Sequence, residues 1–245
     1  MIQNIIKDKP TRLFIILAGF FIANALIAEI IGTKLFSLEK TLGIEPVALN
    51  FFGNIFSFNL TAGVLLWPVV FIMTDIINEY YGMKGVRFLS YFAVILIAYA
   101  FVMFYGAIQL HPADFWAKDY YNGVPDSDKA FSGLMGQSQA IIIASLIAFL
   151  VGQVLDVFIF HKIKEATGEK KVWLRATGST LVSQFVDSFV VLFIAFYVAP
   201  RLSENAKVWS FGLVMATCLG NYIYKFIVAV VLTPVIYLVH GWIEK

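Results

Sequence analysis

Six long apolar runs occupy most of this chain and constrain its fold more than any other feature. An apolar run of about 20 residues crosses the roughly 30 Å hydrocarbon core of a bilayer as a helix. The runs lie near residues 12–36, 60–80, 86–110, 138–161, 178–199 and 209–240. Little sequence remains between them. We therefore expect an all-α integral membrane protein, with one transmembrane domain over residues 1–245 that forms a bundle of about six transmembrane helices.

The composition agrees with this expectation. The chain is 60% hydrophobic and 14% charged, whereas an ordinary soluble domain is about 45–50% apolar and about 25% charged. The net charge of +2 gives no reason to expect a nucleic-acid partner. The only cysteine, Cys218, lies in an apolar run and is expected to be a small core residue. The first run resembles a signal peptide but continues to about Ile31 without a convincing cleavage site, so we expect it to remain as the first helix.

Lysine and arginine are distributed unevenly between the two sides of the predicted topology. With the N-terminus inside, the internal segments hold Lys7, Lys9, Arg12, Lys84, Arg87, Lys162, Lys164, Lys170, Lys171, Arg175 and Lys245. The external loops hold Lys40, Lys118, Lys129, Arg201 and Lys207. Because cytoplasmic loops carry the excess of Lys and Arg, both termini are predicted to be cytoplasmic. The predicted location is the cytoplasmic (inner) membrane, crossed several times, with the polar segment 111–137 outside.

Several polar residues interrupt the apolar runs. The ionisable ones are Glu29, Lys34, Asp75, Glu79, Asp156, Asp187 and Lys225. The neutral ones are Asn24, Gln153, Gln184 and Asn221. A charge that faces lipid near the bilayer centre costs about 2.5–3.5 kcal/mol on insertion scales. These side chains must therefore face one another, water or a ligand.

Helical spacing predicts which of these residues lie together, because residues three or four apart share a face of a helix. Four such pairs occur: Asp75 with Glu79, Gln153 with Asp156, Gln184 with Asp187, and Asn221 with Lys225. In a further series, Arg175, Ser179, Ser183 and Asp187 repeat every four residues and predict a polar stripe along a cavity wall. Two interpretations stay open: the groups line a binding cavity, or they form internal pairs that fix helix packing.

Catalytic motifs are missing from the sequence. The three histidines lie near the ends of the runs without a His-x-x-x-His pair, and we find no nucleophile elbow or phosphate-binding loop. We therefore expect no enzyme, no metal and no cofactor. The small-xxx-small spacings, Gly19 with Ala23 and Ala28 with Gly32, favour packing within the subunit and are also compatible with a homo-oligomer.

Three stretches resemble the queuosine precursor transporter family, also described as a vitamin uptake transporter family. They are WPVVFIMTDIINEYYG from Trp67 to Gly82, GQVLDVFIF from Gly152 to Phe160, and WLRATGSTLVSQFVDSFVVLFIAF from Trp173 to Phe196. The first contains the acidic Asp-x-x-x-Glu-x-Tyr-Gly pattern of that family. The last run, with Tyr224-Lys225 and Thr233-Pro234, is similar too, and the resemblance covers residues from about 12 to 240.

The resemblance implies import of 7-deazaguanine derivatives or queuine, precursors of the tRNA nucleoside queuosine, across the cytoplasmic membrane. A carboxylate can accept two adjacent N–H donors of a guanine-like edge, and Lys, Asn or Gln can donate to its carbonyl oxygen. Asp187 or Asp156 is the expected acceptor. The hypothesis is that one cavity for a planar heterocycle is lined by Asp75, Glu79, Gln153, Asp156, Arg175, Gln184, Asp187, Asn221 and Lys225. Arg175 is expected to pair with an acidic residue at an inner gate.

Three alternatives remain. The first is the substrate-binding subunit of an energy-coupling-factor vitamin importer, which has a similar size and about six spans. The second is a membrane enzyme that acts on lipid. The third is a structural assembly subunit, which would tolerate the loss of single carboxylates.

Overall fold

The computed structural model describes residues 8–45, 49–51, 54–56, 58–118, 124–136, 139–168, 171–202 and 208–243. Five helices within these ranges are long and apolar enough to cross a membrane. They are α2 (Lys9–Ile31), α4 (Trp67–Ile108), α7 (Gln139–Thr167), α8 (Val172–Phe193) and α9 (Phe211–Ile243). The predicted all-α membrane bundle is confirmed.

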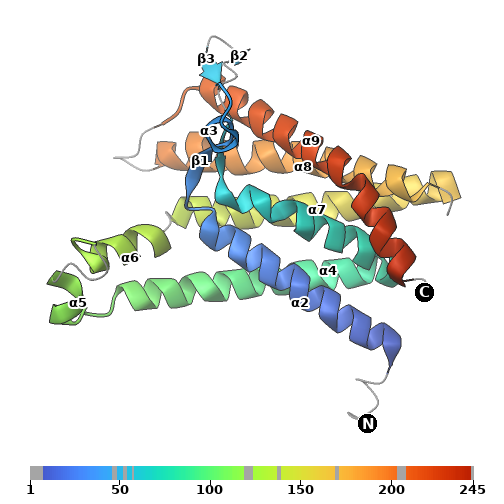
Figure 1. Ribbon diagram of the computed structural model, residues 1–245, viewed down its shortest axis with the longest axis horizontal. Coiled ribbons are helices and arrows are strands. Elements are labelled where there is room, and N and C mark those ends of the chain that lie inside the picture. Colours follow the sequence, from blue (N-terminus) through green and yellow to red (C-terminus); the bar gives the residue numbers. More distant parts are fainter. Residues whose placement is uncertain are drawn as a thin grey trace.

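Helix α4 consists of two straight segments that meet at Gly82. This glycine has φ 68° and ψ −177°, a backbone conformation that side-chain-bearing residues rarely adopt. Thr74 precedes the glycine and Ser90 follows it, yet both hydroxyl groups contact Oε1 of Gln153, each at 3.4 Å. The two segments therefore run side by side in opposite directions (Figure 1). They correspond to the apolar runs near 60–80 and 86–110.

Between α2 and α4 the chain is not a continuous helix. Strand β1 (Leu35–Ser37) pairs in antiparallel fashion with β4 (Asn59–Thr61), and β2 (Leu49–Phe51) pairs with β3 (Asn54–Phe56). The short helix α3 (Leu38–Leu42) and the 3₁₀ turn η1 (Ala62–Leu65) complete this region. The run near 12–36 thus ends earlier as a helix than expected, and the run near 60–80 begins later. Pro68 lies in the first turn of α4, where its missing N–H costs nothing.

The remaining elements lie at the two ends of the bundle. Helices α5 (Asp114–Lys118) and α6 (Ser127–Met135) lie at the end opposite to the start of α2 and the end of α9 (Figure 1). The π-helix η4 (Ile194–Val198) and the 3₁₀ turn η5 (Ala199–Leu202) extend α8. The start of α2 and the end of α9 share one end of the bundle. Which side of the membrane this end faces stays a prediction.

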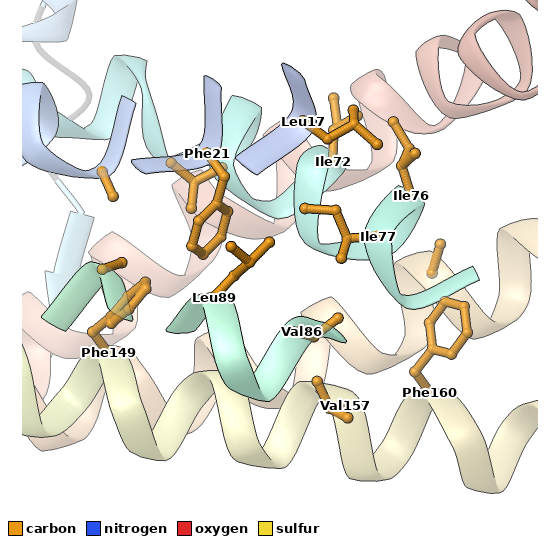
Figure 2. Packing of buried hydrophobic residues seen from close by; sticks show 14 of the residues in the cluster. Leu17, Phe21, Ile72, Ile76, Ile77, Val86, Leu89, Phe149, Val157 and Phe160 are labelled. Carbon is orange, nitrogen blue, oxygen red and sulfur yellow. The ribbon is translucent and has the colours of Figure 1, made fainter. Parts of the chain in front are cut away.

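The core joins α2, both segments of α4, and α7. Figure 2 shows Leu17 and Phe21 of α2 above Ile77 and Leu89 of α4, with Phe149 of α7 below them. Helix α8 packs between α7 and α9. The outward faces carry large exposed apolar side chains, including Ile16, Phe20, Phe88, Ile95, Val102, Phe158 and Val231. An apolar exterior of this extent fits a lipid environment rather than water.

Small residues bring η1 close to α2. A Cβ atom placed on Gly63 would lie 2.5 Å from the carbonyl oxygen of Ala28 and 3.5 Å from Cα of Gly32. The predicted packing role of Ala28 and Gly32 within the subunit is therefore confirmed. Gly19 and Ala23 lie on the exposed face of α2. Cys218 is fully buried, as expected of a core residue.

Candidate functional site

A cavity of about 510 Å³, including its open mouth, lies between the first segment of α4, α8 and α9. Most of its wall is apolar or aromatic and includes Trp67, Phe71, Ile72, Tyr224, Val228 and Leu232. A few polar residues complete it: Asp75, Thr177, Thr180, Gln184 and Lys225. A mostly apolar pocket with a few convergent polar groups is typical of a small-molecule binding site.

Two of the polar residues in this wall carry buried atoms without a hydrogen-bond partner. Asp75 and Gln184 are only 4% and 3% exposed. Within the described part of the chain, nothing donates a hydrogen bond to Oδ1 of Asp75 or to Oε1 of Gln184. A buried polar atom without a partner costs about 1–3 kcal/mol. A molecule in the cavity that donates hydrogen bonds would remove this cost.

Lys225 reaches the cavity from α9 and is already paired. Its Nζ lies 2.5 Å from Oδ2 of Asp187 on α8, and both side chains are mostly buried. The negative charge of Asp187 is thus balanced by Lys225. The expected neighbours Gln184 and Asp187 share a helix, but only Gln184 lines the cavity.

Glu79 lies at the centre of a second charged cluster, one turn along α4 from Asp75. Arg175 binds it through two nitrogen atoms, with Nη2–Oε1 at 2.6 Å and Nε–Oε2 at 3.0 Å. Lys164 contacts the same Oε1 at 3.3 Å, and Nη1 of Arg175 donates to the carbonyl of Gly168 at 2.9 Å. Arg175 is fully buried. The expected pairing of Arg175 with an acidic residue is confirmed.

A smaller hollow of about 260 Å³ lies beside Glu79. Asp75 and Glu79 both line it, together with Tyr80, Phe160 and Val172. Asp75 therefore borders both the large cavity and the small hollow. Glu79 borders the hollow alone.

Two of the other predicted site residues, Asp156 and Gln153, hold helices together. Oγ of Ser183 donates to Oδ1 of Asp156 at 3.2 Å, which ties α8 to α7. Gln153 of α7 receives the hydroxyl groups of both α4 segments. Asn221 donates to the carbonyl of Thr217 on its own helix at 3.0 Å. Asp156, Gln153 and Asn221 do not line the cavity.

The polar stripe on α8 does not form the cavity wall that its spacing predicts. Arg175, Ser179 and Ser183 are fully buried, and the wall is formed instead by Thr177, Thr180 and Gln184. At 3.6 residues per turn, a repeat of four drifts by about 40° at each step. The spacings of three and four between Thr177, Thr180 and Gln184 keep these residues closer to one face of α8. This second pattern is also present in the sequence, but its residues carry no charge, unlike Arg175 and Asp187 in the predicted stripe.

Lys164, Trp67 and Tyr224 also belong to these sites, although none of them is a predicted site residue. In the sequence, Lys164 stands out only as a positive charge of an internal segment, and Trp67 only as the first residue of a stretch that carries the family resemblance. Their positions depend on contacts between helices, which spacing along one helix cannot reveal. Glu29, which had no assigned role, accepts a hydrogen bond from Ser145 at 2.5 Å and so links α2 to α7.

The model of a family described as "Putative vitamin uptake transporter" matches residues 61–239. The chain belongs to this vitamin uptake transporter family. All nine candidate residues, from Asp75 to Lys225, fall inside the matched range. Together with its long apolar helices, family membership makes the chain a multi-pass membrane transporter.

Three curated relatives have the same kind of name. The chain is 29% identical to a "Probable queuosine precursor transporter" of Bacillus subtilis, over 75% of this chain and 73% of the relative. It is 25% identical to a protein of the same name from Haemophilus influenzae, over 93% and 86% of the two chains. It is 27% identical to the "Queuosine precursor transporter" of Escherichia coli, over 73% and 71%. No solved structure matches the chain.

Proposed function

We propose that this chain imports queuosine precursors, either 7-deazaguanine derivatives or queuine, across the cytoplasmic membrane. The observation that carries the proposal is the apolar cavity between α4, α8 and α9. Asp75 and Gln184 line it with buried acceptors that have no partner within the described ranges. The vitamin uptake transporter family and the names of the three relatives support the same cargo.

The cavity suits a flat bicyclic molecule. The ring centroids of Trp67 and Phe71 lie 6.0 Å apart, with an angle of 22° between the ring planes, and the two rings form an aromatic wall on one side of the cavity. Stacking of a base on an aromatic side chain contributes about 1–3 kcal/mol. Lys225 offers a donor for a carbonyl oxygen, because an ammonium group has three protons and Asp187 takes one of them.

The Glu79–Arg175–Lys164 cluster is the proposed inner gate. It lies beside the small hollow that Asp75 also borders. In the proposal, the substrate passes from the cavity through this hollow toward the end of the bundle where α2 begins, which Tyr81 contacts through the carbonyl of Pro10. Passage along this route requires the two hydrogen bonds between Arg175 and Glu79 to open. In this scheme the protein moves its substrate without changing it chemically, and this end of the bundle faces the cytoplasm.

A salvage assay tests the proposed function. Cells that cannot make queuosine would express the chain and receive each precursor at low concentration, with the vector alone as control. We expect queuosine to appear in tRNA with at least one precursor. Its absence with all of them would reject the proposed cargo.

Reconstitution of the isolated chain in vesicles separates this function from that of an energy-coupling-factor subunit. We expect uptake without any other subunit. Uptake that required ATPase subunits, or stable co-purification with them, would favour the alternative.

A further inference from the structure

We propose that Asp75 is the group that recognises the cargo, with Gln184 facing it, and that they select a heterocycle with two adjacent N–H donors. This inference rests on the proposed function, because it takes the cavity to be the transport site. It differs from the expectation drawn from the sequence, in which Asp156 or Asp187 accepts those donors.

The contacts of the other candidate carboxylates exclude them from this role. Asp187 is bound to Lys225, Glu79 is bound to Arg175 and Lys164, and Asp156 accepts from Ser183. None of these three lines the large cavity. Among these four carboxylates, Asp75 alone combines a place in the cavity wall with a buried oxygen that has no partner in the described part of the chain.

The two acceptors reach the cavity from different helices. Asp75 lies on the first segment of α4 and Gln184 lies on α8. A molecule between them can therefore donate to one residue on each side. An amide side chain can present either its oxygen or its nitrogen, so Gln184 can adapt to the edge it meets, whereas an ionised Asp75 can only accept.

The surrounding charges set the polarity of the preferred molecule. The carboxylate of Asp75 favours an edge rich in N–H donors, and Lys225 in the same cavity favours a carbonyl oxygen at the neighbouring edge. A guanine-type ring, with a ring N–H, an amino group and a carbonyl in sequence, meets both demands. A xanthine-type ring places a carbonyl where the amino group should be and would be rejected, because two acceptors then face each other.

Binding of two probe compounds to the purified full-length chain tests the inference. The probes are 7-deazaguanine and 7-deazahypoxanthine, which differ only in the amino group. The wild-type chain should bind 7-deazaguanine more tightly by about tenfold or more, since a hydrogen bond to a charged acceptor is lost with the amino group. In Asp75→Asn this preference should shrink to about threefold or less. Glu165→Gln, which alters an exposed carboxylate on α7, is the matched control and should keep the full preference.

The outcomes separate this inference from the proposed function. A full preference in Asp75→Asn, with the wild-type chain binding 7-deazaguanine normally, would overturn the role of Asp75 and leave the proposed function standing. Binding of neither probe by the wild-type chain would count against both. Gln184→Leu gives an independent readout should Asp75→Asn fail to fold. It should weaken 7-deazaguanine binding, and unchanged affinity would remove Gln184 from the site.

Discussion

Asp75 and Glu79 lie one turn apart on the same helix, yet their surroundings are opposite. Glu79 is bound by Arg175 and Lys164, so its charge is fully compensated within the chain. Asp75 borders a cavity and keeps an oxygen that has no partner among the described residues. The carboxylate of Glu79 therefore contributes to the stability of the fold, whereas the carboxylate of Asp75 is available to a ligand. Substitutions should therefore separate stability from transport.

Removal of Arg175 should have the largest effect on stability. Arg175→Met leaves Glu79 and the carbonyl of Gly168 without their main donor. Breaking a buried ion pair by removing one partner costs about 3–5 kcal/mol. Thermal unfolding of the purified chain should show this loss, whereas Arg87→Met, at an exposed position of α4, should change little. Equal unfolding temperatures for both variants would contradict the structural role of the cluster.

Neutralising Asp187 should stop uptake while the protein still reaches the membrane. Asp187→Asn leaves the ammonium group of Lys225 without its charged partner beside the cavity. We expect a loss of about 1–3 kcal/mol in stability, because a buried polar group loses its partner. The double variant with Lys225→Met should recover part of the stability but not the uptake. Normal uptake by Asp187→Asn would remove this pair from the transport site.

Gly82→Ala tests the chain reversal that positions both carboxylates. The conformation of Gly82 is strained for any residue with a side chain, at about 1–3 kcal/mol. Nothing lies within 4 Å of the added Cβ, so the loss of stability would come from the backbone alone. Gly106→Ala is the matched control, because it also meets no neighbour but lies in a regular helix. It should be neutral or slightly stabilising.

Loss of an acidic group outside the membrane should have the smallest effect. Asp126 caps α6, and the backbone N–H and side chain of Lys129 hold the pKa of its carboxyl below the usual value of 3.8. A carboxyl group whose pKa is lowered in the folded state stabilises the chain at pH values above its unfolded-state pKa. This stabilisation is lost as the pH falls through the folded-state pKa. Asp126→Asn should thus leave uptake unchanged at neutral pH. The variant should be slightly less stable than the wild-type chain at neutral pH, and this difference in stability should shrink below about pH 4. Reduced uptake of the substrate by Asp126→Asn at neutral pH would contradict this expectation, because an acidic residue far from the cavity would then also affect transport.

Much of the fold follows from the sequence, because hydrophobic runs of membrane length leave few alternatives. The apolar runs correspond to the long helices, and the buried polar residues are indeed gathered within the bundle. The strands at 35–37 and 59–61 were not predicted, since each is only three residues long and gives no detectable periodic pattern.

The site could be predicted less well than the fold. Spacing along one helix grouped Gln184 with Asp187 and Asp75 with Glu79, but the strongest interactions join different helices, as in Asp187–Lys225 and Glu79–Arg175. Charge drew attention to Asp156 and Asp187, both of which have partners within the chain. Only the packed structure shows which acceptor is left without one.

The most direct test compares the stability of Asp75→Asn and Glu79→Gln, each with and without 7-deazaguanine. Without ligand, Asp75→Asn should unfold at or above the wild-type temperature, because Oδ1 of Asp75 has no hydrogen-bond partner in the described part of the chain. Glu79→Gln should unfold at a lower temperature. A ligand that binds the folded state raises the unfolding temperature, and this increase should disappear in Asp75→Asn. The assignment of ligand binding to Asp75 and of stability to Glu79 would be contradicted if Asp75→Asn unfolded at as low a temperature as Glu79→Gln and were still stabilised by 7-deazaguanine.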